Sequence, residues 1–254
     1  MNEPLRAAMA EAGQTAESLA EQVGVDPKTT SRWVNPGQTP HPRHRLAAAR
    51  ALGRTVGELW PEVVRRREPD WFLPWAEIER KASTLRAFEP SVLPGLLQTP
   101  EYAHAVLSSG PLGDDEVEGY VTARLARQAA VFDRPRPALT IFVVDEAALR
   151  RGEPEIMHPQ LDHLVTMAER PRVMLHVLPL RAGFHPGQAG AFVIASIDDA
   201  DDLGYLDDQA AGRVVRDVAP LWRVWDTVRS VALPRDQSIR LLKTREWLTR
   251  AWPT

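Results

Sequence analysis

The stretch SLAEQVGVDPKTTSRW, residues 18–33, predicts two short helices joined by a tight turn. Leu19 and Val23 share one face of the first helix, and Gly24 ends it, because glycine adopts the left-handed backbone that other residues resist. Asp26-Pro27 then begins the second helix, since an acidic cap followed by proline at the first helical position is a typical helix start. Together these signals indicate a helix-turn-helix arrangement.

Similar signals on both sides of this stretch extend the arrangement to five short helices. We expect them over residues 5–12, 16–23, 28–34, 43–52 and 56–60. Residues 61–75, PEVVRRREPDWFLPW, contain three consecutive arginines and three prolines, which is typical of a boundary between domains. The sequence therefore predicts an all-α domain over residues 1–62, a linker over 63–74 and a second domain over 75–254.

The second domain mixes two kinds of pattern. Strand-like apolar runs occupy residues 139–144, 173–178 and 192–197, with 204–206 as a short fourth. Helical patterns occur around residues 75–87, 100–109, 115–132, 156–169, 212–231 and 236–250. We therefore expect an α+β protein, in which an all-α domain precedes a larger mixed α/β domain with a small sheet.

Composition excludes several classes of protein. At 254 residues the chain is long for one hydrophobic core, which favours two domains. It has no cysteine, so disulfides, thiolate metal sites and a cysteine nucleophile are excluded. Because we find neither an apolar run long enough to span a membrane nor a secretion signal, we expect a cytoplasmic protein.

Charge is distributed unevenly along the chain. The net charge is −3, yet residues 1–67 hold ten Lys or Arg and only seven Asp or Glu. The remainder is acidic. A small basic region joined to an acidic bulk predicts that one domain binds a polyanion and the other serves a different purpose.

The basic residues of the first domain fall into two clusters. On the helix after the turn, Thr30 and Trp33 should point inward, which leaves the side chains of Lys28, Thr29 and Arg32 outside. Lysine and arginine on such a helix face can read guanine in a major groove. The second cluster, residues 43–45, begins the next predicted helix, where free backbone N–H groups favour an anion.

Residues 15–60 resemble the lambda-repressor-like (xenobiotic-response-element) helix-turn-helix regulators. The resemblance rests on SLAEQVGVDPKTTSRW, GQTP, RLAAARALG and VGELW. It implies double-stranded operator DNA as a partner, with Lys28, Thr29 and Arg32 as base-reading residues. It also implies phosphate contacts from Thr15, Asn35, Gln38, Arg43, His44 and Arg45. The chain departs from the family pattern at Pro36, which is an extra loop residue, and at Ala16, where many relatives have glutamine.

The second domain resembles the C-terminal domain of actinobacterial WhiJ-like or antitoxin-like regulators. The blocks that carry the resemblance include FEPSVLPGLLQTPEYAHAVL (88–107), FVVDEAALRR (142–151) and AGFHPGQAGAFVI (182–194). The resemblance implies a domain that receives a small protein encoded nearby or a small-molecule effector. Within the last block, His185 and Gln188 belong to a loop, HPGQAG, that is either a structural turn or a ligand or partner surface.

An enzyme is not expected. The only polar set worth testing is His158, Asp162, His163, His176 and His185, and its spacing does not match a zinc site. DDADD, residues 198–202, lacks the glycine and distal glutamate of a calcium loop and is expected to be a solvated turn. We expect no catalytic residue, no metal and no cofactor.

Trp222 and Trp225 belong to an apolar stripe on a late helix that is either core or a dimer contact. The function expected from these patterns is a homodimeric, sequence-specific transcription regulator. The alternative is an antitoxin-like interaction module that binds a small protein rather than DNA.

Overall fold

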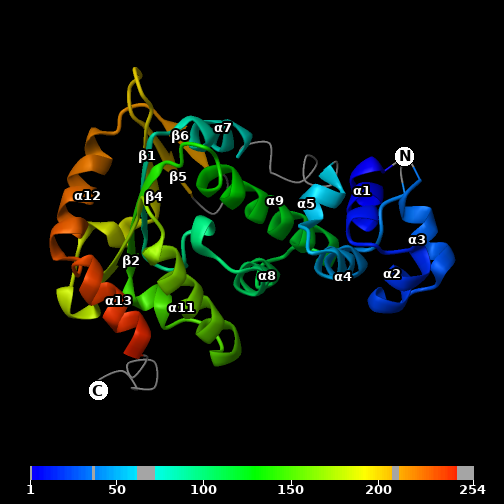
Figure 1. Ribbon diagram of the computed structural model, residues 1–254. Coiled ribbons are helices and arrows are strands. Elements are labelled where there is room, and N and C mark those ends of the chain that lie inside the picture. Colours follow the sequence, from blue (N-terminus) through cyan, green and yellow to red (C-terminus); the bar gives the residue numbers. More distant parts are fainter. Residues whose placement is uncertain (1, 36–37, 62–71, 208–211, 245–254) are drawn as a thin grey trace. The chain divides into compact units, whose positions relative to one another are not determined.

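The computed structural model describes residues 2–35, 38–61, 72–207 and 212–244. It is an α+β structure with a six-stranded mixed sheet, which confirms the expected fold class (Figure 1). The chain divides into two compact units, Met1–Glu68 with His104–Ala126, and Pro69–Ala103 with Arg127–Thr254. Most of the predicted linker, residues 63–74, lies outside the described residues.

The first unit begins with a series of short helices. They are α1 (Glu3–Glu11), α2 (Ala16–Val23), α3 (Pro27–Trp33), α4 (Pro42–Leu52) and α5 (Val56–Leu59). Gly24, at φ 76°, ends α2, and Gly53, at φ 61°, ends α4. The apolar faces of these helices meet in one core formed by Leu5, Ala8, Met9, Leu19, Trp33, Ala48, Ala49, Leu52, Val56, Leu59 and Trp60.

The second unit is built on the sheet, whose strand order is β3-β2-β1-β4-β5-β6. The strands are β1 (Thr84–Glu89), β2 (Leu139–Asp145), β3 (Val173–Leu178), β4 (Phe192–Ser196), β5 (Leu203–Leu206) and β6 (Arg213–Val215). β1, β2 and β3 run parallel, whereas β4, β5 and β6 continue from β1 as an antiparallel meander. β1 is therefore central, with β2 on one side and β4 on the other.

Helices lie before, between and after these strands along the chain. They are α7 (Leu73–Lys81), η1 (Gly95–Leu97), α8 (Pro100–Ser108), α9 (Asp114–Phe132), α10 (Glu146–Leu149), α11 (Pro154–Glu169), η2 (Leu180–Ala182), η3 (Pro186–Ala189), α12 (Ala219–Val231) and α13 (Arg235–Thr244). The two parallel crossovers lead from β1 to β2 and from β2 to β3. Since such crossovers are right-handed, both place their helices on one face. Figure 1 shows α11 on that side of the strands and α12 on the other.

Helix α12 and the sheet enclose an aromatic core. Phe88 of β1 is opposite Val143 of β2 and Phe192 of β4, and all three side chains are buried. Trp225 and Val228 of α12 complete this cluster. The apolar stripe on this helix is therefore core, the first of the two interpretations that the sequence left open.

Two of the strands lie where the sequence predicts helix. Residues 84–87 were assigned to a helix over 75–87, but they begin β1, and α7 ends at Lys81. Residues 213–215 form β6, so the helix predicted over 212–231 begins only at Ala219. In both places pairing with a neighbouring strand outweighs local propensity, as expected for β structure.

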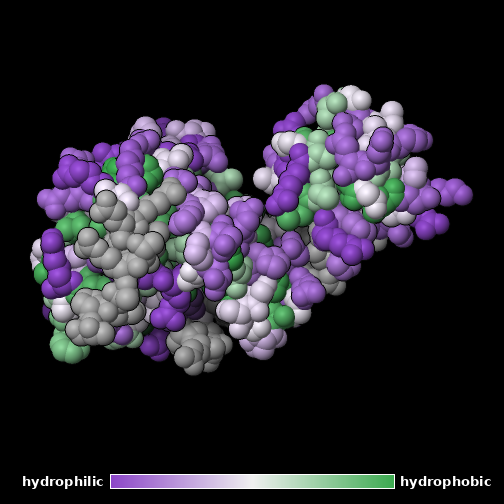
Figure 2. All heavy atoms as spheres, turned by 90° about the horizontal axis from the view of Figure 1, so that it is seen from below, coloured by the Kyte–Doolittle hydropathy of each residue, from purple (hydrophilic) through white to green (hydrophobic). Residues whose placement is uncertain are grey.

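The described helices include none that is long and apolar enough to cross a membrane. In the face that Figure 2 shows, hydrophobic residues lie scattered among hydrophilic ones. DDADD forms the turn between β4 and β5, and Asp198, Asp199 and Asp201 are exposed, as expected for a solvated turn.

The close approach of η3 to β1 gives a stability test. A Cβ on Gly187 would lie 2.5 Å from Cε1 of Phe88 and 2.9 Å from Cγ1 of Val228. We expect Gly187→Ala to lower the free energy of unfolding by about 1–3 kcal/mol, because neither buried side chain has room to move. Denaturant unfolding followed by tryptophan fluorescence measures the change. Gly110→Ala is the control, because its Cβ meets nothing closer than 3.6 Å, and an equal loss in both variants would contradict the prediction.

Candidate nucleic-acid interface

Helix α3 is fixed by contacts on its inner side. The carboxylate of Asp26 accepts a hydrogen bond from the backbone N–H of Lys28 at 2.8 Å and caps the helix. The buried hydroxyl of Thr30 donates to the carbonyl of Ala16 at 2.7 Å, which ties α3 to the start of α2. Trp33 is 4% exposed. The sequence-based prediction that Thr30 and Trp33 point inward is correct.

The opposite side of α3 carries the predicted base-reading residues. Lys28 and Arg32 are exposed, and Thr29 is half-buried between them in the sequence. Within the described part of the chain, neither Lys28 nor Arg32 pairs with a carboxylate. Ser31 is also exposed, but its hydroxyl donates back to the carbonyl of Pro27 at 2.9 Å. The outer side of α3 thus presents two free cationic side chains on a helix whose inner side is held rigidly.

The predicted phosphate-binding residues are arranged around this helix. Thr15 is exposed and caps α2, where its hydroxyl oxygen accepts from the N–H of Ser18 at 3.2 Å. Its hydroxyl can still donate to a phosphate. Asn35 and Gln38 are both exposed, on either side of residues 36–37. The predicted effect of the extra Pro36 falls on those two residues, which lie outside the described ones.

At the start of α4, the three predicted phosphate-binding residues differ in exposure, and Arg43 is the most exposed. Its side chain is exposed, and its Nε donates to Nε2 of His44 at 3.0 Å. His44 is half-buried, because its ring stacks on that of Trp33, with centroids 6.2 Å apart. His44 therefore positions Arg43 and supports α3 rather than facing a phosphate directly.

Arg45 does not lie on the surface. Arg45 is 4% exposed, so its side chain cannot face a phosphate as predicted. The reason is helical periodicity, because Arg45 precedes Ala48, Ala49 and Leu52 by three, four and seven residues, and those three form the core face of α4. The sequence alone shows this spacing, which excludes Arg45 from the exposed face of the helix.

The backbone at this helix start is also less open than predicted. The N–H groups of His44 and Arg45 both donate to the carbonyl of His41, at 2.9 and 3.1 Å. Pro42 has no N–H. Any anion at this position is therefore bound mainly by the side chain of Arg43 rather than by free backbone donors.

The charge of His44 follows from its surroundings. Partial burial, and then the neighbouring Arg43 and His41, lower the pKa of His44 below its ordinary value of about 6.5. The imidazole is thus neutral at pH 7, which agrees with Nε2 accepting from Arg43. The second cluster contributes one exposed charge at neutral pH, from Arg43.

In the second unit, His185 is not a surface residue. Its side chain is 3% exposed, and its Nε2 lies 3.0 Å from Oδ2 of Asp145, at the carboxyl end of β2. Phe88 packs edge-on against its ring. Of the predicted partner surface, Gln188 is exposed, and so is the neighbouring Phe184, at 98%. The loop folds back onto the sheet, because Gly187 permits the close approach to Phe88.

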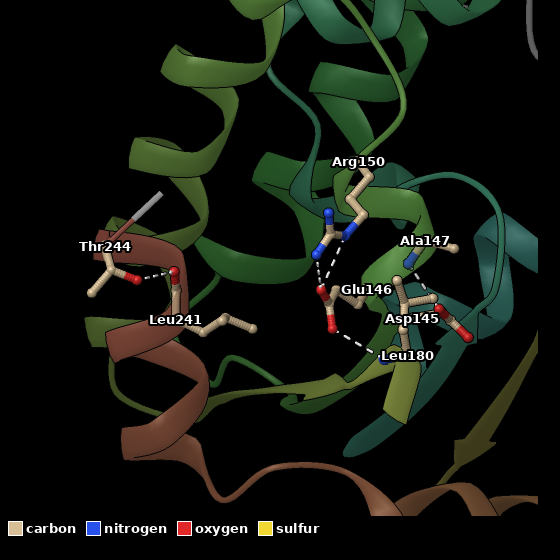
Figure 3. A network of polar contacts seen from close by, with 7 residues as sticks. All are labelled: Asp145, Glu146, Ala147, Arg150, Leu180, Leu241 and Thr244. Carbon is tan, nitrogen blue, oxygen red and sulfur yellow. Dashed lines mark hydrogen bonds and ion pairs between the residues drawn. The ribbon is translucent and has the colours of Figure 1, made fainter. Parts of the chain in front are cut away.

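Figure 3 shows the polar network beside this histidine. The other carboxylate oxygen of Asp145 accepts from the N–H of Ala147 at 2.8 Å and caps α10. Glu146 accepts from the guanidinium of Arg150 at 2.6 Å and from the N–H of Leu180 at 3.0 Å. These contacts join β2, α10 and η2, so the carboxyl edge of the parallel strands is closed by the chain itself.

The remaining histidines are dispersed. His158 is exposed, and His176 is buried with its Nδ1 3.0 Å from the carbonyl of Leu233. Burial lowers the pKa of both His163 and His176. Among the residues described, no three His, Asp or Glu side chains come together as a metal would require.

Comparison with protein families matches residues 73–244 to a domain of unknown function, DUF5753. Because the match covers more than half of the chain, the chain belongs to this family. Comparison with curated proteins and with solved structures found no match. The helices α1–α5 precede the matched residues, so the candidate interface lies outside the family domain.

The contact between Thr30 and Ala16 predicts which hydroxyl on α3 matters for stability. Thr30→Val should lower the free energy of unfolding by about 1–3 kcal/mol, because it removes the buried hydroxyl that donates to the carbonyl of Ala16 and ties α3 to α2. Ser31→Ala removes a hydroxyl that also bonds Pro27 but is exposed, and should change stability by less than about 0.5 kcal/mol. Urea unfolding of both variants decides the matter, and equal losses would contradict the prediction.

The pKa of His44 can be measured directly. We expect an NMR titration to give a midpoint below about 6.5, and Arg43→Gln to raise it, because that variant removes a neighbouring positive charge. A lowered folded-state pKa means that the unfolded chain binds the proton first. The stability from His44 is therefore complete above about pH 6.5 and is lost as the pH falls below it. A midpoint above 6.5 would contradict the prediction.

Proposed function

We propose that the protein is a sequence-specific DNA-binding transcription regulator, whose α2 and α3 act as a helix-turn-helix. In this proposal α3 enters the major groove, with Lys28, Thr29 and Arg32 at base edges. The supporting observation is the contrast between the two sides of α3. The inner side is held by Thr30 and Trp33, while the outer side carries two exposed cations with no carboxylate partner among the described residues.

Phosphate contacts would come from the margins of this helix. Arg43 is exposed at the start of α4, and Thr15, Asn35 and Gln38 are exposed near the ends of α2 and α3. Contacts of this kind fix a helix in register on the duplex without reading its sequence. The net positive charge of residues 1–67 supports the same assignment, since it favours DNA at that part of an otherwise acidic chain.

A regulator of this kind reads a two-fold operator as a homodimer. Trp225 and Val228 of α12 are buried within the chain, which favours a dimer contact made by other residues. In the proposal the second unit provides that contact and receives a signal, and the protein acts in the cytoplasm.

A second candidate function, a module that binds a small partner protein, has one observation in its favour. Phe184 is 98% exposed in the loop that also carries the exposed Gln188. A large apolar side chain in that position can serve as an anchor for another protein. If binding to this partner were the main role, affinity for DNA would be weak and would vary little with salt.

The DNA proposal is tested with fragments selected from a genomic library by the purified protein. Arg32→Ala should lose about 1–3 kcal/mol of discrimination at one base pair, because it removes a bidentate contact to a base. Arg43→Ala should weaken binding to all sequences alike and reduce the salt slope by about one, because it removes a phosphate contact. Fluorescence anisotropy at several salt concentrations measures both effects.

Arg240→Ala is the matched control, because it removes one exposed positive charge from α13 in the second unit. It should leave both discrimination and salt slope unchanged. If Arg32→Ala and Arg43→Ala behaved like this control, the proposed docking would be wrong.

A further inference from the structure

A cationic hollow lies at the amino edge of the parallel strands. Its volume is about 740 Å³, and its lining includes Lys81, Arg134, Arg136 and Arg172, with Asp198 as the acidic member. The four basic residues precede β1, β2 and β3, so the three strands bring together residues that are far apart in the sequence. All of them belong to the second unit.

Two of the arginines are held in place by the backbone. The guanidinium of Arg134 donates to the carbonyls of Arg80, Ala82 and Arg136, the last at 2.7 Å. Nε of Arg172 donates to the carbonyl of Pro137 at 2.9 Å. These contacts fix the charges without neutralising them, because carbonyls carry no net charge and most of the N–H groups of Arg172 are left over.

The backbone of Arg172 is itself unusual. Its φ is 64°, a left-handed conformation that residues other than glycine rarely adopt. The N–H of Thr140 in β2 donates to its carbonyl at 2.8 Å and holds it there. Strain that the surrounding structure maintains is typical of functional positions.

The four like charges share the hollow with one carboxylate, that of Asp198. Among the described residues, no carboxylate pairs with any of the four cations. Burial, and then the nearby Arg172, lower the pKa of Arg134, as expected where two guanidinium groups lie close together. An anion placed between them would relieve this repulsion and accept their remaining N–H groups.

We propose that this hollow binds a small polyanion, a metabolite that carries two or more phosphate or carboxylate groups. The ligand needs two or more such groups because four cations line the hollow. The volume of the hollow, about 740 Å³, lies within the range of roughly 300–1,000 Å³ that is usual for ligand sites. Pro135 and Pro137 add rigid apolar wall beside the charges, against which the uncharged part of the ligand can pack.

The hollow lies at the edge of the sheet opposite to the one where ligands usually bind. Open α/β sheets usually bind ligands beyond the carboxyl ends of their strands. Here that edge is filled by η2 and η3, with Gly187 against Phe88 and His185 on Asp145. The amino edge is left as the open one. Within the proposed function this ligand would be the signal that the second unit receives, but binding itself does not depend on DNA.

Isothermal titration calorimetry of the full chain at low salt, without DNA, tests the proposal. The probes are pyrophosphate, citrate and acetate, so that phosphate and carboxylate sources are distinguished. We expect pyrophosphate or citrate to bind at one site per chain and acetate to show no saturable binding. Failure of both polyanions to bind would overturn the proposal, whatever the result with DNA.

Variants show whether the ligand occupies this hollow. Arg136 makes no hydrogen bond with its side chain among the described residues, so Arg136→Ala should leave the fold intact and weaken binding about tenfold or more. Arg172→Lys, which keeps the charge but loses the guanidinium, should weaken it less. Arg151→Ala, at an exposed site outside the hollow, should change nothing. Equal weakening by Arg151→Ala would mean unspecific attraction and would overturn the proposal.

DNA is the competing occupant. If pyrophosphate and citrate failed to bind but Arg136→Ala lowered the affinity for DNA, the hollow would be a nucleic-acid contact instead. Thermal unfolding of each variant confirms that lost binding is not lost folding.

Discussion

The indole of Trp33 holds together the part of the first unit on which the candidate interface depends. It lies at the end of α3, stacks on His44 of α4 and meets Trp60 edge-on, with ring centroids 6.2 and 6.5 Å away. Because aromatic rings pack in a few preferred geometries, these contacts limit how α3 can turn or slide relative to α4. The exposed cations of α3 and the exposed Arg43 of α4 are therefore held in a fixed relation. Without that relation, two cationic sites of a few residues each could not recognise one stretch of a duplex.

Phe88 has a comparable role in the second unit. It lies on the central strand, is fully buried, and contacts both Gly187 and His185 of the loop that follows β3. This packing closes the carboxyl edge of the sheet with the protein's own chain. The consequence is a division between the two edges. Apolar and paired residues fill one edge. At the other gather arginines that no carboxylate pairs with among the described residues, and solvent or a ligand can reach them.

The sequence predicted the first helices well, because their ends are marked by local signals such as Gly24, Gly53 and the Asp26 cap. It failed where long-range contacts decide. The residues of β1 are acceptable in a helix, and only pairing with β2 and β4 makes them a strand. The buried position of His185 could not be predicted for the same reason, since nothing in the local sequence shows that its loop folds inward. Arg45 is different, because its spacing from Ala48 and Leu52 already indicates a buried position, although its charge favours the surface. The cationic hollow could not be predicted at all, since without β1 the segments before the three strands have no reason to meet.

The two cationic surfaces differ in construction, and this difference suits them to different anions. Lys28 and Arg32 are exposed, and the side chains of such residues retain much of their freedom, which suits a long polyanion that is attracted over a distance and then read by contact. Arg134 and Arg172 are instead pinned to backbone carbonyls before any ligand arrives, so a small anion that binds them loses little affinity to ordering the site. The charge of the chain strengthens the division. The residues beyond 67 are net acidic, so their field repels a long duplex, while a compact ligand inside the hollow feels chiefly the four nearest cations. Under the proposed function, DNA therefore binds the first unit, and the arginine-lined hollow of the second unit takes a small anion.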